Sequence, residues 1–134
     1  MSTPDPAPVL EFWLGDVDAQ GRAPGATAAK WWMKSDAFDA EITQRFETLY
    51  ESVCQGACES WLDAPRHRVA YVIVLDQFSR NMFRDTAKMY AEDARAQRVV
   101  REGLAQGCDR ELGFHARYFF YMPFMHAEDR ALQD

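Results

Sequence analysis

Apolar side chains recur at spacings of three and four in two long segments, and both are predicted to be amphipathic α-helices. In the first, Ser35 and Asp36 can cap the start, and Gly56 ends or interrupts the helix. Its apolar face is formed by Phe38, Ile42, Phe46, Leu49, Tyr50 and Val53. The second is predicted over residues 87–106, with a stop at Gly107. Its apolar face carries Met89, Ala96, Val100 and Leu104, whereas Arg95, Arg98, Arg101 and Glu102 lie mostly outside.

Two further segments are rich in apolar or aromatic side chains, and periodicity does not determine the structure of the first of them. Residues 69–75 (VAYVIVL) are rich in β-branched side chains and fit a strand or a buried helix equally well. Residues 114–121 are almost all aromatic, and Pro123 is expected to break or restart the helix that they begin. Pro65 fits the first turn of the element that contains residues 69–75.

The first 33 residues contain short elements and loops. Residues 1–8 are rich in proline and are predicted to form a loose, flexible arm. A short apolar cluster then reads as a helix that ends at Gly15, and residues 16–26 read as a loop. Trp31 and Trp32 are predicted to anchor the chain to the core after this loop.

Length and composition indicate one globular domain over residues 1–134, because the chain has 134 residues of which 48% are hydrophobic. Residues 1–65 carry 11 acids and 4 bases, so neither nucleic acid nor an anionic membrane is expected as a partner. No signal peptide or long apolar span is present, and a cytoplasmic location is expected. The three cysteines include Cys54 and Cys58 at i, i+4, which lack a second Cys/His pair; we expect them to be small core residues, with no metal ion and no cofactor.

A polar network is predicted where charged side chains interrupt the apolar segments. In a helix, Asp76 shares a face with Val69, Val72 and Ile73, so its carboxylate belongs to the buried side. A buried carboxylate needs partners, and the nearest candidates are Arg80 at i+4 and Arg84 beyond it. The neighbouring amides of Gln77 and Asn81 can join this network. Asp93 falls on the apolar face of its own predicted helix and is a second partner for Arg80 or Arg84. The network either fastens helices together or forms the polar wall of a pocket.

A third group of polar side chains follows Pro123. His126 and Asp129 stand at i, i+3, a spacing at which a histidine and a carboxylate can bind a metal or act as an acid–base pair. Glu128 lies between them in the sequence. The alternative is a helix N-terminus with favourable acids beside a hydrogen-bonded histidine. Tyr118 and Tyr121 can supply hydroxyl groups nearby, although aromatic residues at this density more often form core.

Two separated motifs resemble a known family. Residues 75–84 (LDQFSRNMFR) and 119–129 (FFYMPFMHAED) are similar to the bacterial domain of unknown function nine hundred and twenty-four. The resemblance implies an all-α fold in which antiparallel helix pairs form a tetratricopeptide-like right-handed superhelix of about five to six helices. Residues 69–75 would then be helical. The family usually has Pro at Ser79, an acid at Met125 and Ser at Ala127, and its members continue for several helices beyond the position of Asp134.

Three functions fit these residues. The first is a binding module in which Asp76, Gln77, Asn81, Glu128 and Asp129 line a polar pocket, with Arg80, Arg84 and His126, for a small anionic molecule or a peptide end. The second is a hydrolase-like enzyme with His126 as general base, Asp76 or Glu128 orienting it and Arg80 stabilising a developing anion. The third is a structural scaffold for protein interactions. A second copy of the chain is a further possible partner.

Overall fold

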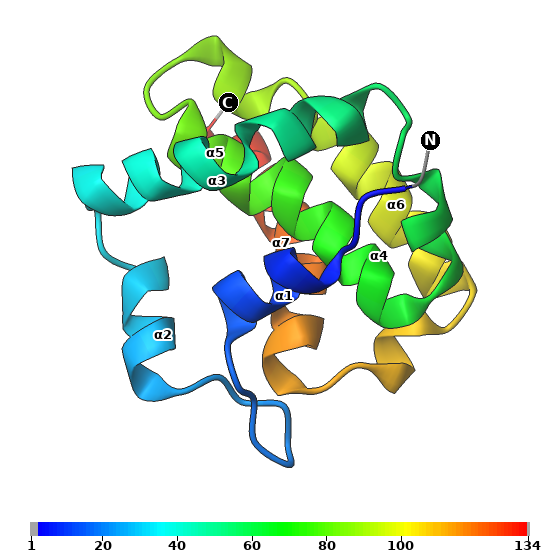
Figure 1. The fold of residues 1–134 in the computed structure, drawn as a ribbon. Coiled ribbons are helices and arrows are strands. Elements are labelled where there is room, and N and C mark those ends of the chain that lie inside the picture. The colour runs from blue at the N-terminus through cyan, green and yellow to red at the C-terminus, as the bar shows by residue number, and fades with distance from the viewer. Residues whose placement is uncertain (1–2, 134) are drawn as a thin grey trace.

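The computed structural model describes the backbone of residues 3–133 and the side chains of residues 3–128, and every regular element in that part of the chain is helical (Figure 1). The all-α prediction is therefore confirmed. The α-helices are α1 (Ala7–Leu14), α2 (Gly25–Trp31), α3 (Asp36–Cys54), α4 (Pro65–Val72), α5 (Ser79–Met82), α6 (Asp93–Ala105) and α7 (Phe114–Gln133). Short 3₁₀ turns form η1 (Glu59–Asp63), η3 (Ala87–Tyr90) and η4 (Cys108–Glu111), and η2 (Ile73–Phe78) is a π-helical segment. The tetratricopeptide-like superhelix stays a prediction.

The centre of the molecule is one rod made of α4, η2 and α5, which follow each other without a break from Pro65 to Met82. Every residue from Val69 to Leu75 is fully buried, which is why this run has no polar face. Around the rod, α1, α6 and α7 pack against α4, and α3 packs against η2 and α5 (Figure 1). The run that was ambiguous in sequence is thus a helix surrounded by other helices. Within residues 3–133 we find no helix long and apolar enough to cross a bilayer.

Several local predictions are confirmed by the backbone. The Ser35 hydroxyl accepts a hydrogen bond from the Phe38 amide at 3.2 Å and caps α3. Pro65 lies in the first turn of α4, where its missing N–H costs nothing. Gly15 ends α1 at a φ of 67°, a conformation that favours glycine. Gly107 takes up the left-handed conformation directly after α6 and its cap.

The N-terminal arm and the loop after α1 are shorter than the sequence predicts. Ala7 and Pro8 are already helical, because the Asp5 carboxylate accepts a hydrogen bond from the Ala7 amide and prolines suit a first turn. The α2 helix buries no residue completely and so has no apolar periodicity to predict it. Trp31 is the anchor that we expected, since its indole N–H donates to the Trp13 carbonyl at 2.9 Å. Trp32 is not, because 63% of it is exposed.

Two helix boundaries also differ from the prediction. The second amphipathic helix begins at Asp93 rather than at residue 87, because residues 87–90 form a 3₁₀ turn that brings the Tyr90 ring over the Arg80 guanidinium at 5.5 Å. Pro123 does not interrupt α7. It removes one backbone hydrogen bond, but Phe119, Phe120 and other apolar side chains around it are buried and hold the helix together.

Candidate functional site

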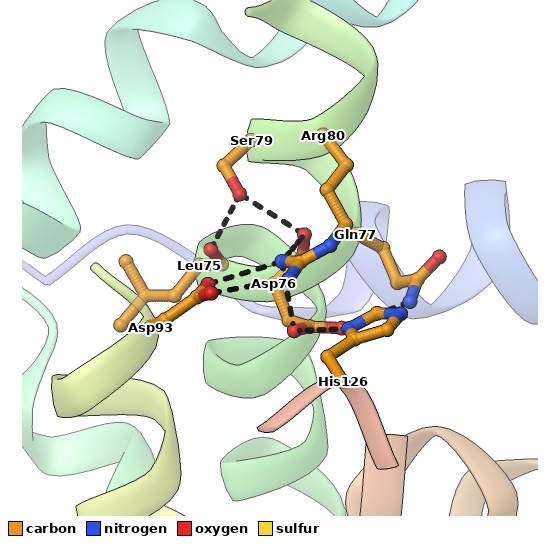
Figure 2. Close-up of polar contacts among 7 residues, drawn as sticks. All are labelled: Leu75, Asp76, Gln77, Ser79, Arg80, Asp93 and His126. Carbon is orange, nitrogen blue, oxygen red and sulfur yellow. Dashed lines mark hydrogen bonds and ion pairs between the residues drawn. The ribbon is translucent and has the colours of Figure 1, made fainter. Parts of the chain in front are cut away.

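Asp76 is the centre of the polar network, and it lies in the π-helical segment η2 with only 1% of its surface exposed. Its Oδ1 accepts a hydrogen bond from Arg80 Nη1 at 3.0 Å and lies 2.9 Å from Nδ1 of His126. Its Oδ2 accepts one from the Gln77 amide at 2.9 Å. Figure 2 shows these groups gathered around the carboxylate, with the Gln77 amide oxygen pointing away from it. The expected network around Asp76 is present.

Arg80 joins two helices by binding a second carboxylate. Its Nη1 and Nη2 donate to the two oxygens of Asp93, both at 3.1 Å, in the bidentate arrangement that guanidinium groups favour. Nη1 also reaches the backbone carbonyl of Asp76. This pairing across 13 residues fastens η2 and α5 to the start of α6, as the apolar-face position of Asp93 predicted. Because the Asp76 and Asp93 carboxylates share the single Arg80 guanidinium, these three residues together have a formal charge of −1.

The π-helical segment explains the role of Ser79. A π segment shifts backbone hydrogen bonds from i+4 to i+5, so carbonyl groups at its end need other donors. The buried Ser79 hydroxyl donates to the carbonyls of Leu75 at 2.6 Å and Asp76 at 3.0 Å (Figure 2). Ser79 therefore supplies a side-chain donor to the distorted turn.

Arg84 and Asn81 belong to a different group of contacts. Both donate to Asp39 in the first turn of α3: Arg84 through Nε at 2.8 Å and Nη2 at 3.2 Å, and Asn81 through its amide at 2.8 Å. The prediction that Arg84 pairs with Asp76 or Asp93 is wrong. Burial alone would raise the pKa of Asp39, but the hydrogen bonds from Arg84 and Asn81 outweigh it and lower the pKa. Asp39 was missed because its partners lie more than 40 residues away.

His126 is the member of the network that reaches the surface. It comes from α7, fifty residues from Asp76, and 25% of its side chain is exposed. Of the two acids proposed to orient it, Asp76 makes the contact and Glu128 is exposed. The side chain of Asp129 lies outside the described residues. Tyr121 points elsewhere, since its hydroxyl donates to Asp109 at 2.7 Å.

A further buried charge, which could not be predicted from the sequence pattern, lies in α4 itself. Arg68 is 3% exposed, and its guanidinium donates to the carbonyls of Val99 at 2.8 Å and Leu62 at 2.9 Å. It therefore connects η1, α4 and α6 through backbone groups alone. Arg68 directly precedes the buried run and lies near the start of α4, where arginines are often exposed, so the sequence gives no sign that it is buried.

The chemistry available at the network is that of an imidazole held by a carboxylate. Neither Cys54 nor Cys58 is activated: burial, followed by Glu92, raises the pKa of Cys54, and burial raises that of Cys58. Among the side chains described, no three His, Cys, Asp or Glu residues are grouped as metal ligands would be. Three open depressions of about 230, 260 and 240 Å³ lie on other surfaces.

Comparison with known proteins identifies the family. The model of the family "Bacterial protein of unknown function (DUF924)" matches residues 9–134. The chain belongs to this family. A solved structure of a protein of unknown function, ATU0120 from Agrobacterium tumefaciens, is similar over 96% of this chain and 67% of that chain, with 35% sequence identity and a TM-score of 0.80. A comparison with curated proteins found no match.

Proposed function

We propose that this DUF924 protein is a helical binding module that contacts a small polar ligand through His126. The observation that carries the proposal is the 2.9 Å contact between His126 Nδ1 and a carboxylate that is almost completely buried. A carboxylate at this position accepts a hydrogen bond from Nδ1–H and so fixes the tautomer of the ring. In the neutral ring, Nε2 is then a hydrogen-bond acceptor that points away from Asp76.

The same contacts suggest the chemistry of the ligand. Gln77 donates one of its two amide N–H groups to Asp76, which leaves its amide oxygen as a second acceptor and its other N–H as a donor. Two acceptors and one amide donor favour a ligand with a hydroxyl group, which can both donate and accept, or with an ammonium group for the two acceptors. An anion or peptide carboxylate, the class expected from sequence, would have to replace Asp93 on Arg80 or share Arg84 with Asp39. At Arg80, beside His126, that exchange gives up bidentate bonds, so we place the anionic class second.

A calorimetric and thermal-shift screen tests this proposal. The probes are polyols, amino sugars, amino acids and short dicarboxylic acids, applied to the parent chain, His126→Ala and His67→Ala. His67 is an exposed histidine at the start of α4, so it controls for loss of an imidazole. A ligand that binds only the folded state adds about 2.7 kcal/mol of stability at one hundred times its Kd. We expect a hydroxyl- or amine-bearing probe to stabilise the parent and His67→Ala, but not His126→Ala.

Two results would count against a binding module at His126. One is a ligand whose affinity is the same in His126→Ala as in the parent. The other is a ¹⁵N spectrum in which neutral His126 carries its proton on Nε2, because the acceptor would then be absent. Absence of a response to every probe, together with strong destabilisation by Asp76→Asn, supports the structural scaffold instead.

Hydrolase-like catalysis is a second candidate, favoured by the same Asp76–His126 pair. With Asp76 holding Nδ1–H, the Nε2 lone pair can take a proton from water, which then attacks an ester or amide carbonyl. General-base assistance of this kind accelerates reactions by about 10² to 10⁴-fold. We therefore expect any esterase activity on a panel of chromogenic esters to fall by that factor in His126→Ala and to persist in His67→Ala. Turnover that survives His126→Ala eliminates this candidate.

A further inference from the structure

The turn formed by residues 18–23, which leads from α1 to α2, closes over the start of α7. Its carbonyl groups at Gln20 and Gly21 accept hydrogen bonds from the amides of Phe114 and His115 at 3.0 and 3.1 Å. These two amides begin α7, where backbone N–H groups have no partner within the helix. The turn therefore caps α7, although the two segments are far apart in the sequence.

The imidazole of His115 adds a third bond to this contact and serves in it as the acceptor. The Ala23 amide donates to His115 Nδ1 at 2.7 Å. A ring nitrogen accepts a hydrogen bond only while it carries no proton, so the neutral ring holds its proton on Nε2. Protonation makes both ring nitrogens donors, and the Ala23 N–H then faces another N–H in place of a lone pair. A single proton therefore breaks this bond.

Two glycines let the turn approach α7 closely enough for these bonds. A Cβ atom added to Gly113 would lie 2.9 Å from the Gly21 Cα, and one added to Gly21 would lie 2.6 Å from the Gly113 Cα. Both positions are too close for a side chain, so the two backbones meet directly. Any side chain at Gly113 should push the turn away from α7.

The α2 helix follows the turn directly and is weakly attached to the core. None of its residues is buried. Its last residue, Trp31, donates its indole N–H to the Trp13 carbonyl at 2.9 Å. The Trp31 ring also packs edge-to-face on the His115 imidazole at 4.8 Å. His115 thus contacts both the turn that precedes α2 and the residue that ends it. Segments with few buried side chains open at a low cost in free energy, without unfolding of the core.

The charged groups that act on the His115 ring both belong to the turn. Burial and then the Arg22 guanidinium lower the pKa of His115, and Asp18 opposes them in part. The side chains that face the ring from α2 and α7 are uncharged aromatic groups: Trp31, Phe114 and Tyr118. Release of the turn removes both the burial and the arginine, so the ring takes up a proton more readily in the released form. Acid therefore shifts the equilibrium towards release.

We propose that residues 18–23 and His115 form an acid-operated latch, which releases the turn and α2 from the start of α7. In the closed form, the lone pair on His115 Nδ1 holds the Ala23 amide and the turn caps α7. In the open form, protonated His115 offers no acceptor, the first amides of α7 lose their carbonyl partners, and α2 loses the support of the turn before it. The latch precedes Pro123 in α7, whereas His126 follows it, so the latch does not depend on the proposed binding site.

Amide hydrogen exchange, followed by NMR from about pH 7.5 down to about pH 4.5, tests the latch. The latch amides are those of Ala23, Phe114 and His115, and the Ala28 amide, which bonds to the Pro24 carbonyl, reports on α2. Because opening takes up one proton, we expect the protection factors of these amides to fall by up to about tenfold per pH unit below pH 6.5, until the closed-state midpoint is passed. The fully buried Val72 reports on global unfolding, and its amide should stay at least about tenfold better protected than the latch amides.

Three variants separate the latch from other effects of acid. His115→Asn places an amide oxygen near the position of Nδ1, so it keeps an acceptor but takes up no proton, and the protection of its Ala23 amide should no longer depend on pH. Gly113→Ala changes no titratable group, yet its Cβ should hold the latch open, with Ala23 protection lower by at least about tenfold already at about pH 7.5. His67→Asn removes an exposed imidazole at the start of α4 and should keep the pH dependence of the parent.

Four results would overturn the latch. The first is a loss of Ala23 protection with acid that is as large in His115→Asn as in the parent. The second is equal protection of the latch amides and Val72 at every pH, because the turn would then leave α7 only when the whole chain unfolds. The third is a ¹⁵N spectrum in which neutral His115 carries its proton on Nδ1. The fourth is an Ala28 amide that keeps its protection while the latch amides lose theirs, since α2 would then not be released.

Discussion

Replacing Arg80 with methionine should destabilise the fold far more than replacing an exposed arginine. Arg80 donates four hydrogen bonds, two of them bidentate to Asp93 and one to the carboxylate of Asp76. The carboxylate side chains are 1% and 10% exposed, so solvent does little to replace the lost cation. Removing one partner of a buried ion pair costs about 3–5 kcal/mol. Because Asp76 keeps its Gln77 and His126 contacts, we expect the lower end, about 3 kcal/mol.

Arg98→Met provides the control. Arg98 and Glu102 also form an i, i+4 pair, but their atoms are 4.0 Å apart and their side chains are 56% and 53% exposed. Exposed pairs of this kind contribute about 0.3–0.5 kcal/mol. Urea unfolding followed by tryptophan fluorescence and circular dichroism measures both variants. With a urea m-value of about 1–3 kcal/mol per molar, the Arg80→Met midpoint should fall by roughly 1–3 M.

Equal free energies of unfolding for Arg80→Met and Arg98→Met would contradict a stabilising role for the four Arg80 hydrogen bonds. A double-mutant cycle with Asp93→Asn then tests the pairing itself. If the bidentate bonds carry the effect, the coupling energy between positions 80 and 93 should exceed about 1 kcal/mol. Additive losses would instead point to altered packing of the arginine stem.

Three smaller perturbations address other contacts. Asp39→Asn should lower the free energy of unfolding above pH 3.8, the ordinary pKa of this carboxyl group. The difference from the parent should shrink as the pH falls through the lowered pKa of Asp39 in the folded state. Urea unfolding at several pH values measures this difference. Ser79→Ala should cost about 1 kcal/mol and speed amide exchange in η2, since the Leu75 carbonyl loses its side-chain donor and the Asp76 carbonyl keeps only Arg80. Burial and then Arg22 lower the pKa of His115, so its NMR titration midpoint should lie below 6.5. Neutral His115 contributes its full share of the free energy of unfolding above pH 6.5, and this contribution declines as the pH falls towards the midpoint.

The features predicted from sequence are those that depend on local spacing. The capped α3 helix, the inward position of Asp93 and the Asp76–Arg80 pair each follow from 3.6 residues per turn and neighbours within four positions. The family resemblance, rather than periodicity, decided that residues 69–75 are helical. Periodicity cannot separate a strand from a helix that is buried on all sides.

The features that sequence did not predict depend on contacts between distant segments. Arg84 had two candidate acids eight and nine residues away, yet it binds Asp39, which lies 45 residues earlier. The path of α7 through Pro123 depends on packing that outweighs a local penalty of about 3 kcal/mol. The start of α6 depends on the position of Arg80 relative to Asp93 and Tyr90. In each case, contacts between segments that are distant in the sequence outweighed the structure or partner that neighbouring residues favoured.

Whether the Asp76 network exists for stability or for function can be decided by removing all of its charges at once. Breaking one ion pair is costly, but replacing a buried charged group with apolar side chains of similar volume is often neutral or stabilising by about 1–4 kcal/mol. We therefore expect the triple variant Asp76→Leu, Arg80→Met, Asp93→Leu to fold with at least the stability of Arg80→Met alone. His126 would lose its acceptor while α7 stays in place. If the triple variant is stable and has lost the ligand found with the parent, the charges serve binding; if it unfolds, their geometry is required by the π-helical turn itself.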